Sequence, residues 1–248
     1  VEIARALGAE VRSVPWNDSF SEARNHSLDM ASGDWILVLD GDEALRPESG
    51  PVLQRMARRT DLLGALGRLV DHADGQTHSD WVLRFFRNAP EHRFVGAIHN
   101  QLCPEFHAKA ERDGMRLAME AEFAIDHWGY SRDAKRSKKK DERSLRLYER
   151  ALRDEPDNVF LRYKYADFLR GQGDPERALA ALDDVCERVE AFPPEERASY
   201  TWCTECYALH ALELMNAGRL DEAVVRLEQA AHCHATANLR FVYALRRR

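Results

Sequence analysis

The segment "WILVLDGDEAL", residues 35–45, decides the fold of the first half of the chain. Five apolar residues lead directly into Asp40-Gly41-Asp42-Glu43. An apolar run of this kind predicts a strand that is covered by helices on both faces. Three carboxylates at its end repel one another, so the arrangement is costly unless a positive charge lies between them.

The carboxylates Asp40 and Asp42 form a candidate metal site. Successive side chains of an extended segment point to opposite sides, so we expect Asp40 and Asp42 to share one side. Open α/β sheets bind ligands at the carboxyl ends of their strands, and hard oxygen ligands suit Mg²⁺ or Mn²⁺ holding a diphosphate. The alternative is a solvated acidic turn, because Asp-Gly-Asp also occurs by chance.

Two other acidic loops can be compared with this segment. An EF-hand loop beginning at Asp40 needs Gly and Glu where Leu45 and Pro51 stand, so it is excluded. A phosphatase of the haloacid dehalogenase type also places Asp-x-Asp after an apolar strand. Ala44 stands where that motif has Thr or Val, which makes it the weaker competitor.

Helical and extended patterns alternate around the segment. Ser19 and Glu22 form a capping box for a helix over residues 19–31. Pro47 opens another helix, with Val52, Leu53 and Met56 facing inward. Strands are predicted over residues 10–14, 36–39, 65–70, 81–87 and 120–127. This order predicts an α/β half with a mixed sheet over residues 1–132.

From residue 133 to residue 248 the pattern is helical and repeats itself. Positions 144, 148 and 151 recur 34 residues later as Ala178, Leu182 and Val185, and again, after an insertion, at Ala223, Leu227 and Ala230. Small residues also occur at Ala166 and Ala211, and turns are expected at Gly173 and Gly218. This period resembles tetratricopeptide (TPR) repeats, so we expect antiparallel helix pairs with alanines at close crossings.

Composition excludes several classes of protein. The net charge of −6 argues against nucleic acid as a partner, and no apolar run is long enough for a transmembrane helix. Five cysteines without a framework spacing indicate a reducing compartment, and hence a cytoplasmic location. Cys203, Cys206 and the segment 232–234 lie in helical repeats without second pairs at zinc-site spacing, so zinc is disfavoured.

Several segments together resemble a known family. "WNDSFSEARNHSLDMASGDWILVLDGDEAL" (residues 16–45) resembles the central part of family 2 glycosyltransferases, in which Ala-Arg-Asn on a helix precedes the strand that ends in the Asp-x-Asp (DXD) motif. "RFVGAIHNQL" (93–102) and "DHWGY" (126–130) resemble two later segments. "LYERALRDEPDNVFLRYKYADFL" (147–169) resembles the transition into the TPR tail of a bacterial group within that family.

The resemblance implies a GT-A fold, followed by TPR-like helical repeats, and a metal-dependent, inverting glycosyltransferase. A nucleoside-diphosphate sugar is the donor, and a glycan, a lipid or a polypeptide carries the acceptor hydroxyl. The resemblance also implies that the chain starts after the first nucleotide-binding elements of the family. We therefore expect residues 1–248 alone to be inactive and to bind the donor weakly.

The same resemblance assigns roles to residues. Mn²⁺ or Mg²⁺ is expected on Asp40, Asp42 and His127, and the donor or acceptor on Arg24, Asn25, Asp40, His99 and Trp128. For Trp128 the residue type favours packing in the core over stacking on a sugar ring, and for Arg24 a salt bridge on a helix face is the competing role. The catalytic base is the departure from the family, because Asn100 stands where Glu is usual. Glu105 and Asp126 are the remaining carboxylates for that role.

Two points stay open in the sequence. An interaction protein, with repeats that bind a protein partner and a vestigial catalytic half, is the alternative function, and Asn100 favours it. The basic run Lys138-Lys139-Lys140 is expected to be a solvated helix face. Its alternative is contact with an anionic acceptor or with the inner face of the membrane.

Overall fold

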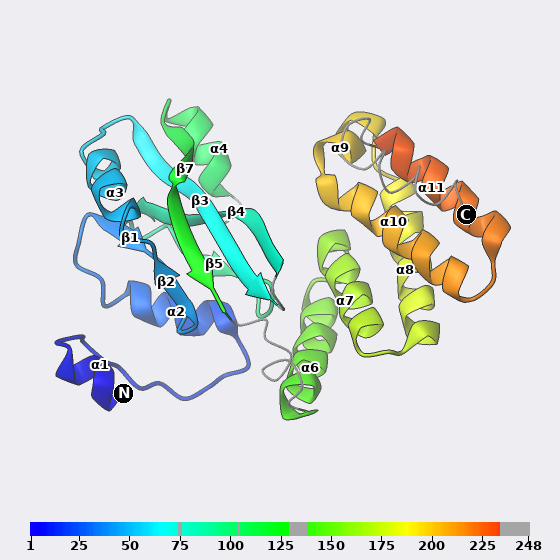
Figure 1. Cartoon of the computed structure of the whole chain (residues 1–248), viewed down its shortest axis with the longest axis horizontal. Helices are drawn as coiled ribbons and strands as arrows, with labels where there is room; N and C mark the ends of the chain where they lie inside the picture. Colours follow the sequence, from blue (N-terminus) through cyan, green and yellow to red (C-terminus); the bar gives the residue numbers. More distant parts are fainter. Residues whose placement is uncertain (74–75, 104, 129–137, 234–248) are drawn as a thin grey trace. The chain divides into compact units, whose positions relative to one another are not determined.

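The computed structural model describes residues 1–73, 76–103, 105–128 and 138–233 (Figure 1). The chain divides into two compact units, residues 1–147 and 148–248, and each is described by itself. The boundary expected at residue 133 falls among residues 129–137, outside the described part. The predicted fold class, an α/β half with a mixed sheet followed by helical repeats, is confirmed.

The main sheet of the first unit has five strands in the order β1-β4-β3-β7-β2. Only β3 and β7 pair in parallel among these neighbours, so the sheet is mixed. The strands are β1 (Trp35–Leu37), β2 (Glu43–Leu45), β3 (Leu62–Ala73), β4 (Gln76–Arg87) and β7 (Arg116–His127). The strands predicted over 65–70, 81–87 and 120–127 lie within β3, β4 and β7. A separate ribbon pairs β5 (Phe94–Val95) with β6 (Gln101–Leu102).

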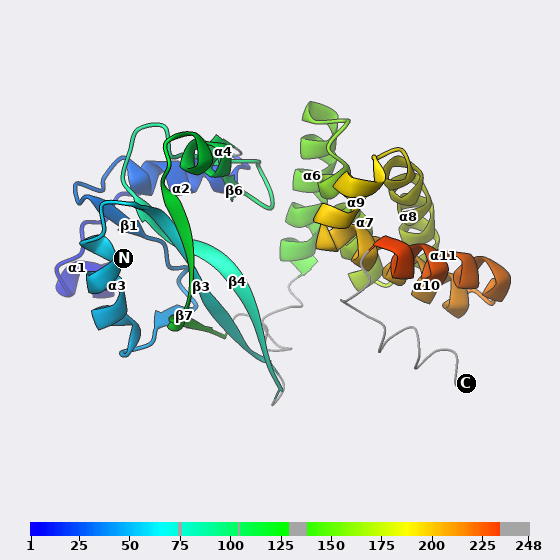
Figure 2. The same ribbon diagram turned by 90° about the horizontal axis from the view of Figure 1, so that it is seen from above.

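Helices cover both faces of this sheet (Figure 2). Neighbouring residues of one strand, such as Phe85 and Phe86 of β4, point to opposite faces and belong to two different core clusters. On the face of Phe85, helix α3 (Ser49–Ala57) buries Val52, Leu53 and Met56, as predicted. On the face of Phe86 lie α2 (Phe20–Leu28) and α4 (Glu105–Arg112), through Leu28, Phe106 and Ala110.

Close packing between β3 and β7 depends on one glycine. A Cβ atom on Gly67 would lie 2.4 Å from the ring of Phe123, which is fully buried. Because no side chain fits there, Gly67 lets the aromatic ring of β7 lie directly on the backbone of β3. This contact holds β3 against β7, the strand that ends in the predicted site residues Asp126 and His127.

The start of the chain agrees with the sequence only in part. They form a short helix, α1 (Glu2–Ala6), which ends before Gly8 at φ +82°, as expected for a helix end. The strand predicted over 10–14 is wrong, since these residues join no strand of the described structure. Glu10, Arg12 and Ser13 are exposed, and Val11 and Val14 are only half-buried. The sequence also missed α4 and the short strand β2.

The second unit consists of paired helices in its described residues. Helix α7 (Val159–Gly171) packs on α8 (Pro175–Glu190), and α10 (Thr201–Asn216) packs on α11 (Leu220–Cys233). The predicted turn glycines end α7 and α10 with φ values of +74° and +76°. The four alanines expected at the crossings are almost fully buried: Ala166, Ala178, Ala211 and Ala223. The repeat interpretation is therefore confirmed.

Two further helices complete this picture. Helix α6 (Lys138–Asp154) precedes the pairs, and its Tyr148 ring contacts Phe168 of α7 at a centroid distance of 5.1 Å. The short helix α9 (Pro194–Ser199) is the insertion that separates the two repeats. None of the helices in the described segments combines the length and apolar character that crossing a bilayer requires.

Candidate functional site

The Asp-Gly-Asp segment forms a turn and is not extended. The N–H of Glu43 donates to the carbonyl of Asp40 at 3.0 Å, and β2 begins at Glu43. The alternation that was expected to place Asp40 and Asp42 on one side therefore does not apply. The turn instead distributes the carboxylates among different partners. Strand β1 is covered on both faces, as expected, because Trp35 packs in the cluster of α3 and Ile36 in the cluster of α2, and it lies at an edge of the described sheet.

Asp40 lies against two arginines. Arg24 of α2 donates to both carboxylate oxygens at 2.6 and 2.8 Å, and Arg84 of β4 donates to one of them at 3.2 Å. Burial alone would raise the pKa of Asp40, but the charges and hydrogen bonds of Arg24 and Arg84 hold it below its usual value. The positive charge that we expected near Asp40 is thus supplied by two arginine side chains of the protein itself.

Glu43 and Arg84 form a buried ion pair that the sequence did not predict. The two side chains are separated by 2.5 Å and are 1% and 12% exposed. Glu43 also accepts a hydrogen bond of 2.8 Å from the main-chain N–H of Asp40. The carboxylate of Glu43 therefore holds the turn in place. The only sequence signal for this role was its position next to Asp42.

Asp42 faces His127, the last residue of β7. Strand β2 pairs with β7 so that Glu43 is opposite His127, and the N–H of Trp128 donates to the carbonyl of Asp42 at 3.1 Å. The Nε2 atom of His127 lies 3.5 Å from Oδ2 of Asp42. The Asp42 side chain is 53% exposed, so this pair can be reached by a ligand.

Asp71 of β3 fixes the orientation of His127. The two residues are register partners in the parallel pair of β3 and β7, and Nδ1 of His127 hydrogen-bonds to Oδ1 of Asp71. A carboxylate on Nδ1 keeps the proton there and directs the lone pair of the neutral imidazole to Nε2, the nitrogen facing Asp42. The sequence missed Asp71, since only the sheet register brings it to His127.

Asp126 is held by an arginine and a histidine. Arg46 donates to both carboxylate oxygens, at 3.0 and 2.7 Å, and His72 Nε2 lies 2.7 Å from Oδ1. The hydrogen bonds from Arg46, together with those from His72, lower the pKa of Asp126 to about 2. A carboxylate with this pKa accepts a proton poorly at neutral pH, so the geometry gives the expected role as base no support.

Asn25 and His99 lie at the β5–β6 ribbon. The amide of Asn25 is paired with the main chain of Phe94, donating to its carbonyl at 3.0 Å and accepting from its N–H at 2.9 Å. Asn25 thereby joins α2 to the ribbon. His99 is exposed in the turn of that ribbon, with φ +49°. The side chain of Glu105 lies outside the described part of the structure.

The structure thus gathers the predicted residues into two groups that the turn connects. The first group contains Arg24 and Asp40, with Arg84 and Glu43 added by the fold. The second contains Asp42, His127 and the main chain of Trp128, with Asp71 added by the fold. Within the described residues no set of three or more His, Cys, Asp or Glu side chains is arranged to hold a metal ion. Asp42 and His127 offer two ligands.

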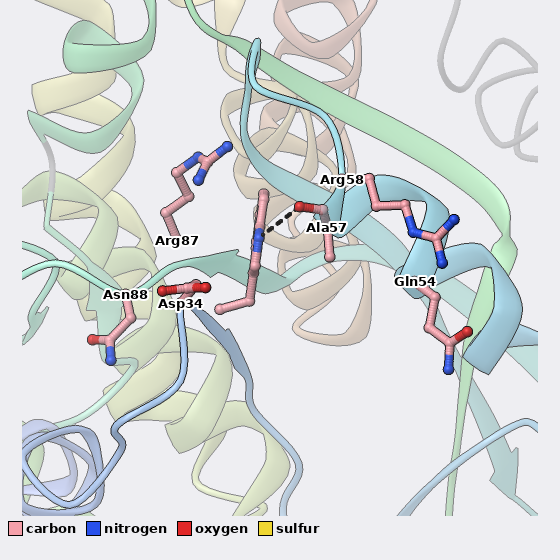
Figure 3. A pocket seen from close by; sticks show the side chains of 7 residues that line it. Asp34, Gln54, Ala57, Arg58, Arg87 and Asn88 are labelled. Atoms are coloured by element: carbon pink, nitrogen blue, oxygen red, sulfur yellow. Dashed lines mark hydrogen bonds between the residues drawn. The ribbon is translucent and has the colours of Figure 1, made fainter.

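The described pockets lie away from both groups. One pocket of about 460 Å³ lies between the start of β1 and the end of α3 and is lined by Asp34, Trp35, Gln54, Ala57, Arg58, Arg87 and Asn88 (Figure 3). The indole N–H of Trp35 donates to the carbonyl of Ala57 at 3.1 Å across it. Another, of about 430 Å³, is lined by Glu91, His92, Cys103, Phe106, Lys109 and Arg112. Neither contains a predicted site residue.

The cysteines expected not to bind zinc are buried in the repeats. Cys203 and Cys206 are fully buried on α10, and Cys206 Sγ lies 3.7 Å from Cys186 Sγ of α8. Burial raises the pKa of the Cys203 thiol to about 12, which is unfavourable for a metal ligand. His234, the last residue of the histidine-cysteine-histidine segment, lies outside the described residues.

Comparison with known proteins gives the site its context. Residues 1–117 match the family model described as Glycosyl transferase family 2, and residues 147–180 match a tetratricopeptide repeat. A TPR repeat-containing protein of Synechococcus elongatus is 31% identical over 92% of this chain and 55% of its own length. The SPbeta prophage-derived glycosyltransferase SunS of Bacillus subtilis is 25% identical over 60% of this chain and 34% of its own length. The matches thus span between a third and about half of these relatives.

Proposed function

We propose, from a family 2 glycosyltransferase domain followed by a tetratricopeptide repeat, that the protein transfers a sugar from a nucleoside diphosphate to an acceptor hydroxyl. The resemblance implies inversion at the anomeric carbon. The observation that carries the proposal is the array of Asp42, His127 and Asp71 beside the Asp-Gly-Asp turn. An exposed carboxylate and an oriented imidazole at the end of a sheet suit the binding of a metal-diphosphate group.

The donor set fits a Mn²⁺ or Mg²⁺ ion bound in part by substrate. Such ions commonly take one or two protein carboxylates and complete their shell with water and phosphate oxygens, and imidazole is acceptable to Mn²⁺. Asp42 and His127 would hold the ion, and Asp71 would keep His127 in the ligating tautomer. Asp40 was expected to be a third ligand, but Arg24 and Arg84 already occupy it. The ion supplies neutralisation of the charge that develops on the leaving diphosphate.

The residues around Asp40 have a different task. Arg24 and Arg84 keep Asp40 ionised, and its side chain is still 42% exposed. An ionised, anchored carboxylate accepts hydrogen bonds from hydroxyl groups, so we assign Asp40 to a sugar or ribose hydroxyl of the donor. Arg24 is then chiefly a positioning residue for Asp40. Asn25 positions the ribbon that carries His99.

Two carboxylates were expected as candidates for the base that accepts the proton of the acceptor hydroxyl, and one of them is retained. Asp126 is committed to Arg46 and His72 and is poorly suited. Glu105, the first residue of α4, is therefore the candidate. Asn100 cannot take this role, because its amide has no basic group at neutral pH.

The experiment is an assay of the full-length protein with a panel of uridine and guanosine diphosphate sugars. Release or transfer of the sugar in the presence of Mn²⁺ is the expected result. Absence of turnover with every donor, under conditions where the protein is folded, would contradict the proposal.

A second function is favoured by two observations. The relative from Synechococcus elongatus carries only the repeats in its name, and Asn100 stands where a base is usual in the family. An interaction protein with a vestigial catalytic half would bind a protein partner through its repeats but would show no affinity for a nucleoside diphosphate. For either function, the cytoplasmic location of the protein stays a prediction from cysteine usage.

A further inference from the structure

Trp128 is an exposed aromatic residue directly beside the proposed diphosphate site. Its side chain is 51% exposed, so the core-packing role favoured by the sequence is wrong. It follows His127 in the chain, and its main-chain N–H is bonded to the carbonyl of Asp42. The backbone that carries this indole is therefore tied to both residues of the proposed metal pair.

A layer of polar residues supports the indole from behind. The ring of His72 stacks on Trp128 with a centroid distance of 5.6 Å and an interplanar angle of 17°. His72 is held by Asp126, and Asp126 is held by Arg46. An aromatic side chain fixed in this way loses little conformational entropy when a ligand binds to it.

The surroundings of the indole match the surface of a pyranose. Exposed polar side chains accompany the platform: Asp42, whose carbonyl binds the N–H of Trp128, is 53% exposed, and Arg46, which holds Asp126 behind His72, is 37% exposed. A pyranose ring has one face rich in C–H groups and an edge of hydroxyl groups. The negative face of an aromatic ring attracts such C–H groups, and the exposed polar side chains can bind the hydroxyls. A lipid chain would instead need a broader apolar surface.

The platform belongs to a different part of the sheet from the group around Asp40. Trp128 follows β7 and His72 lies on β3, whereas Arg24 lies on α2, Arg84 lies on β4, and Asp40 lies in the turn after β1. Because we assign the donor hydroxyls to Asp40, the platform is left for the second substrate.

We propose that Trp128, backed by His72, binds a pyranose ring of a carbohydrate acceptor. This inference rests on the proposed function. His72, Asp126 and Arg46 act through Trp128 and are positioning residues. The inference narrows the acceptor from a glycan, a lipid or a polypeptide to a glycan.

Binding of saccharides tests the inference without requiring turnover. Saturation-transfer NMR is recorded on the full-length protein with methyl glycosides of glucose, galactose and N-acetylglucosamine. We expect a saturable signal that is lost in Trp128→Ala, largely kept in Trp128→Phe, and unchanged in Trp81→Ala. Trp81, on β4, is 41% exposed and is the matched control. Loss of the stacked ring should raise the dissociation constant about tenfold.

His72 is tested by rescue. His72→Ala should weaken saccharide binding, and His72→Phe should restore most of it, because a phenyl ring can still support the indole. In the transfer assay, Trp128→Ala should raise the KM for a saccharide acceptor about tenfold. The KM for the donor should change little. Equal saccharide binding by wild type and Trp128→Ala, or transfer only to a polypeptide or a lipid vesicle, would overturn the inference. Lack of donor turnover by the wild type would instead overturn the proposed function.

Discussion

At the scale of single residues, long-range pairing decides which carboxylate does what. The sequence predicted that Asp40 and Asp42 would act together, but Arg84 lies 44 positions from Asp40 and joins it through the sheet. Asp71 lies 56 positions from His127 and meets it for the same reason. Short-range patterns identify acidic and histidine candidates, whereas their partners follow from strand register, which no local pattern encodes.

Asp42 should matter more for turnover than His127. Asp42→Ala removes the anionic ligand of the proposed ion, and loss of that stabilisation of the leaving group should lower the rate roughly 10³-fold. His127→Ala removes a neutral ligand, leaves Asp42 in place, and should cost less. The measurement is donor turnover by the full-length variants at saturating Mn²⁺. Near wild-type turnover of Asp42→Ala would contradict this assignment.

Protonation of Asp126 in acid should lower the stability of the protein. Its pKa is about 2 in the folded state, below the ordinary value near 3.9, so its ion pairs stabilise the fold above pH 4 and lose this contribution as the pH falls towards 2. The contribution is about 2 kcal/mol. Asp126→Asn should lower the free energy of unfolding at pH 7 by that amount and flatten its decline between pH 4 and pH 2.

Denaturant unfolding at several pH values measures this effect. Glu122→Gln is the matched control, because the pair of Glu122 with Arg55 is 71% and 64% exposed and should contribute less than 1 kcal/mol. Identical pH profiles of Asp126→Asn and wild type would show that the ion pairs around Asp126 contribute nothing to stability.

At the scale of elements, prediction succeeded where one periodic face is buried. The spacing of Val52, Leu53 and Met56 predicted the buried face of α3, and all three are buried. Prediction failed where no amphipathic signal exists. The strand β2 has three residues and is defined only by its pairing with β7, and the turn before it depends on the buried pair of Glu43 and Arg84.

The helix crossings of the repeats offer a direct test of the predicted register. Ala178 on α8 is completely buried, so Ala178→Leu should overpack its crossing and lower the free energy of unfolding by about 1–3 kcal/mol. Val224→Leu on α11 is the control, since Val224 is 52% exposed and has room for one more methylene. Equal melting temperatures of the two variants would contradict the crossing.

At the scale of the whole molecule, the two units were predictable for different reasons. A 34-residue repeat is visible in the sequence because each helix pair must bury its small residues against the next, and it also matches a tetratricopeptide repeat model. The sheet was predictable as a class, but its strand order β1-β4-β3-β7-β2 was not. Several strand orders bury the same apolar residues, and the sequence pattern does not distinguish them.

The central claim is that Asp42 and His127 hold a divalent cation that binds a nucleoside diphosphate. The most direct test is isothermal titration of UDP and GDP into the full-length protein, with Mn²⁺ and with excess chelator. We predict that one nucleotide binds with Mn²⁺, that the chelator abolishes this binding, and that Asp42→Ala abolishes it as well. Binding that persists with the chelator, or in Asp42→Ala, would contradict the claim.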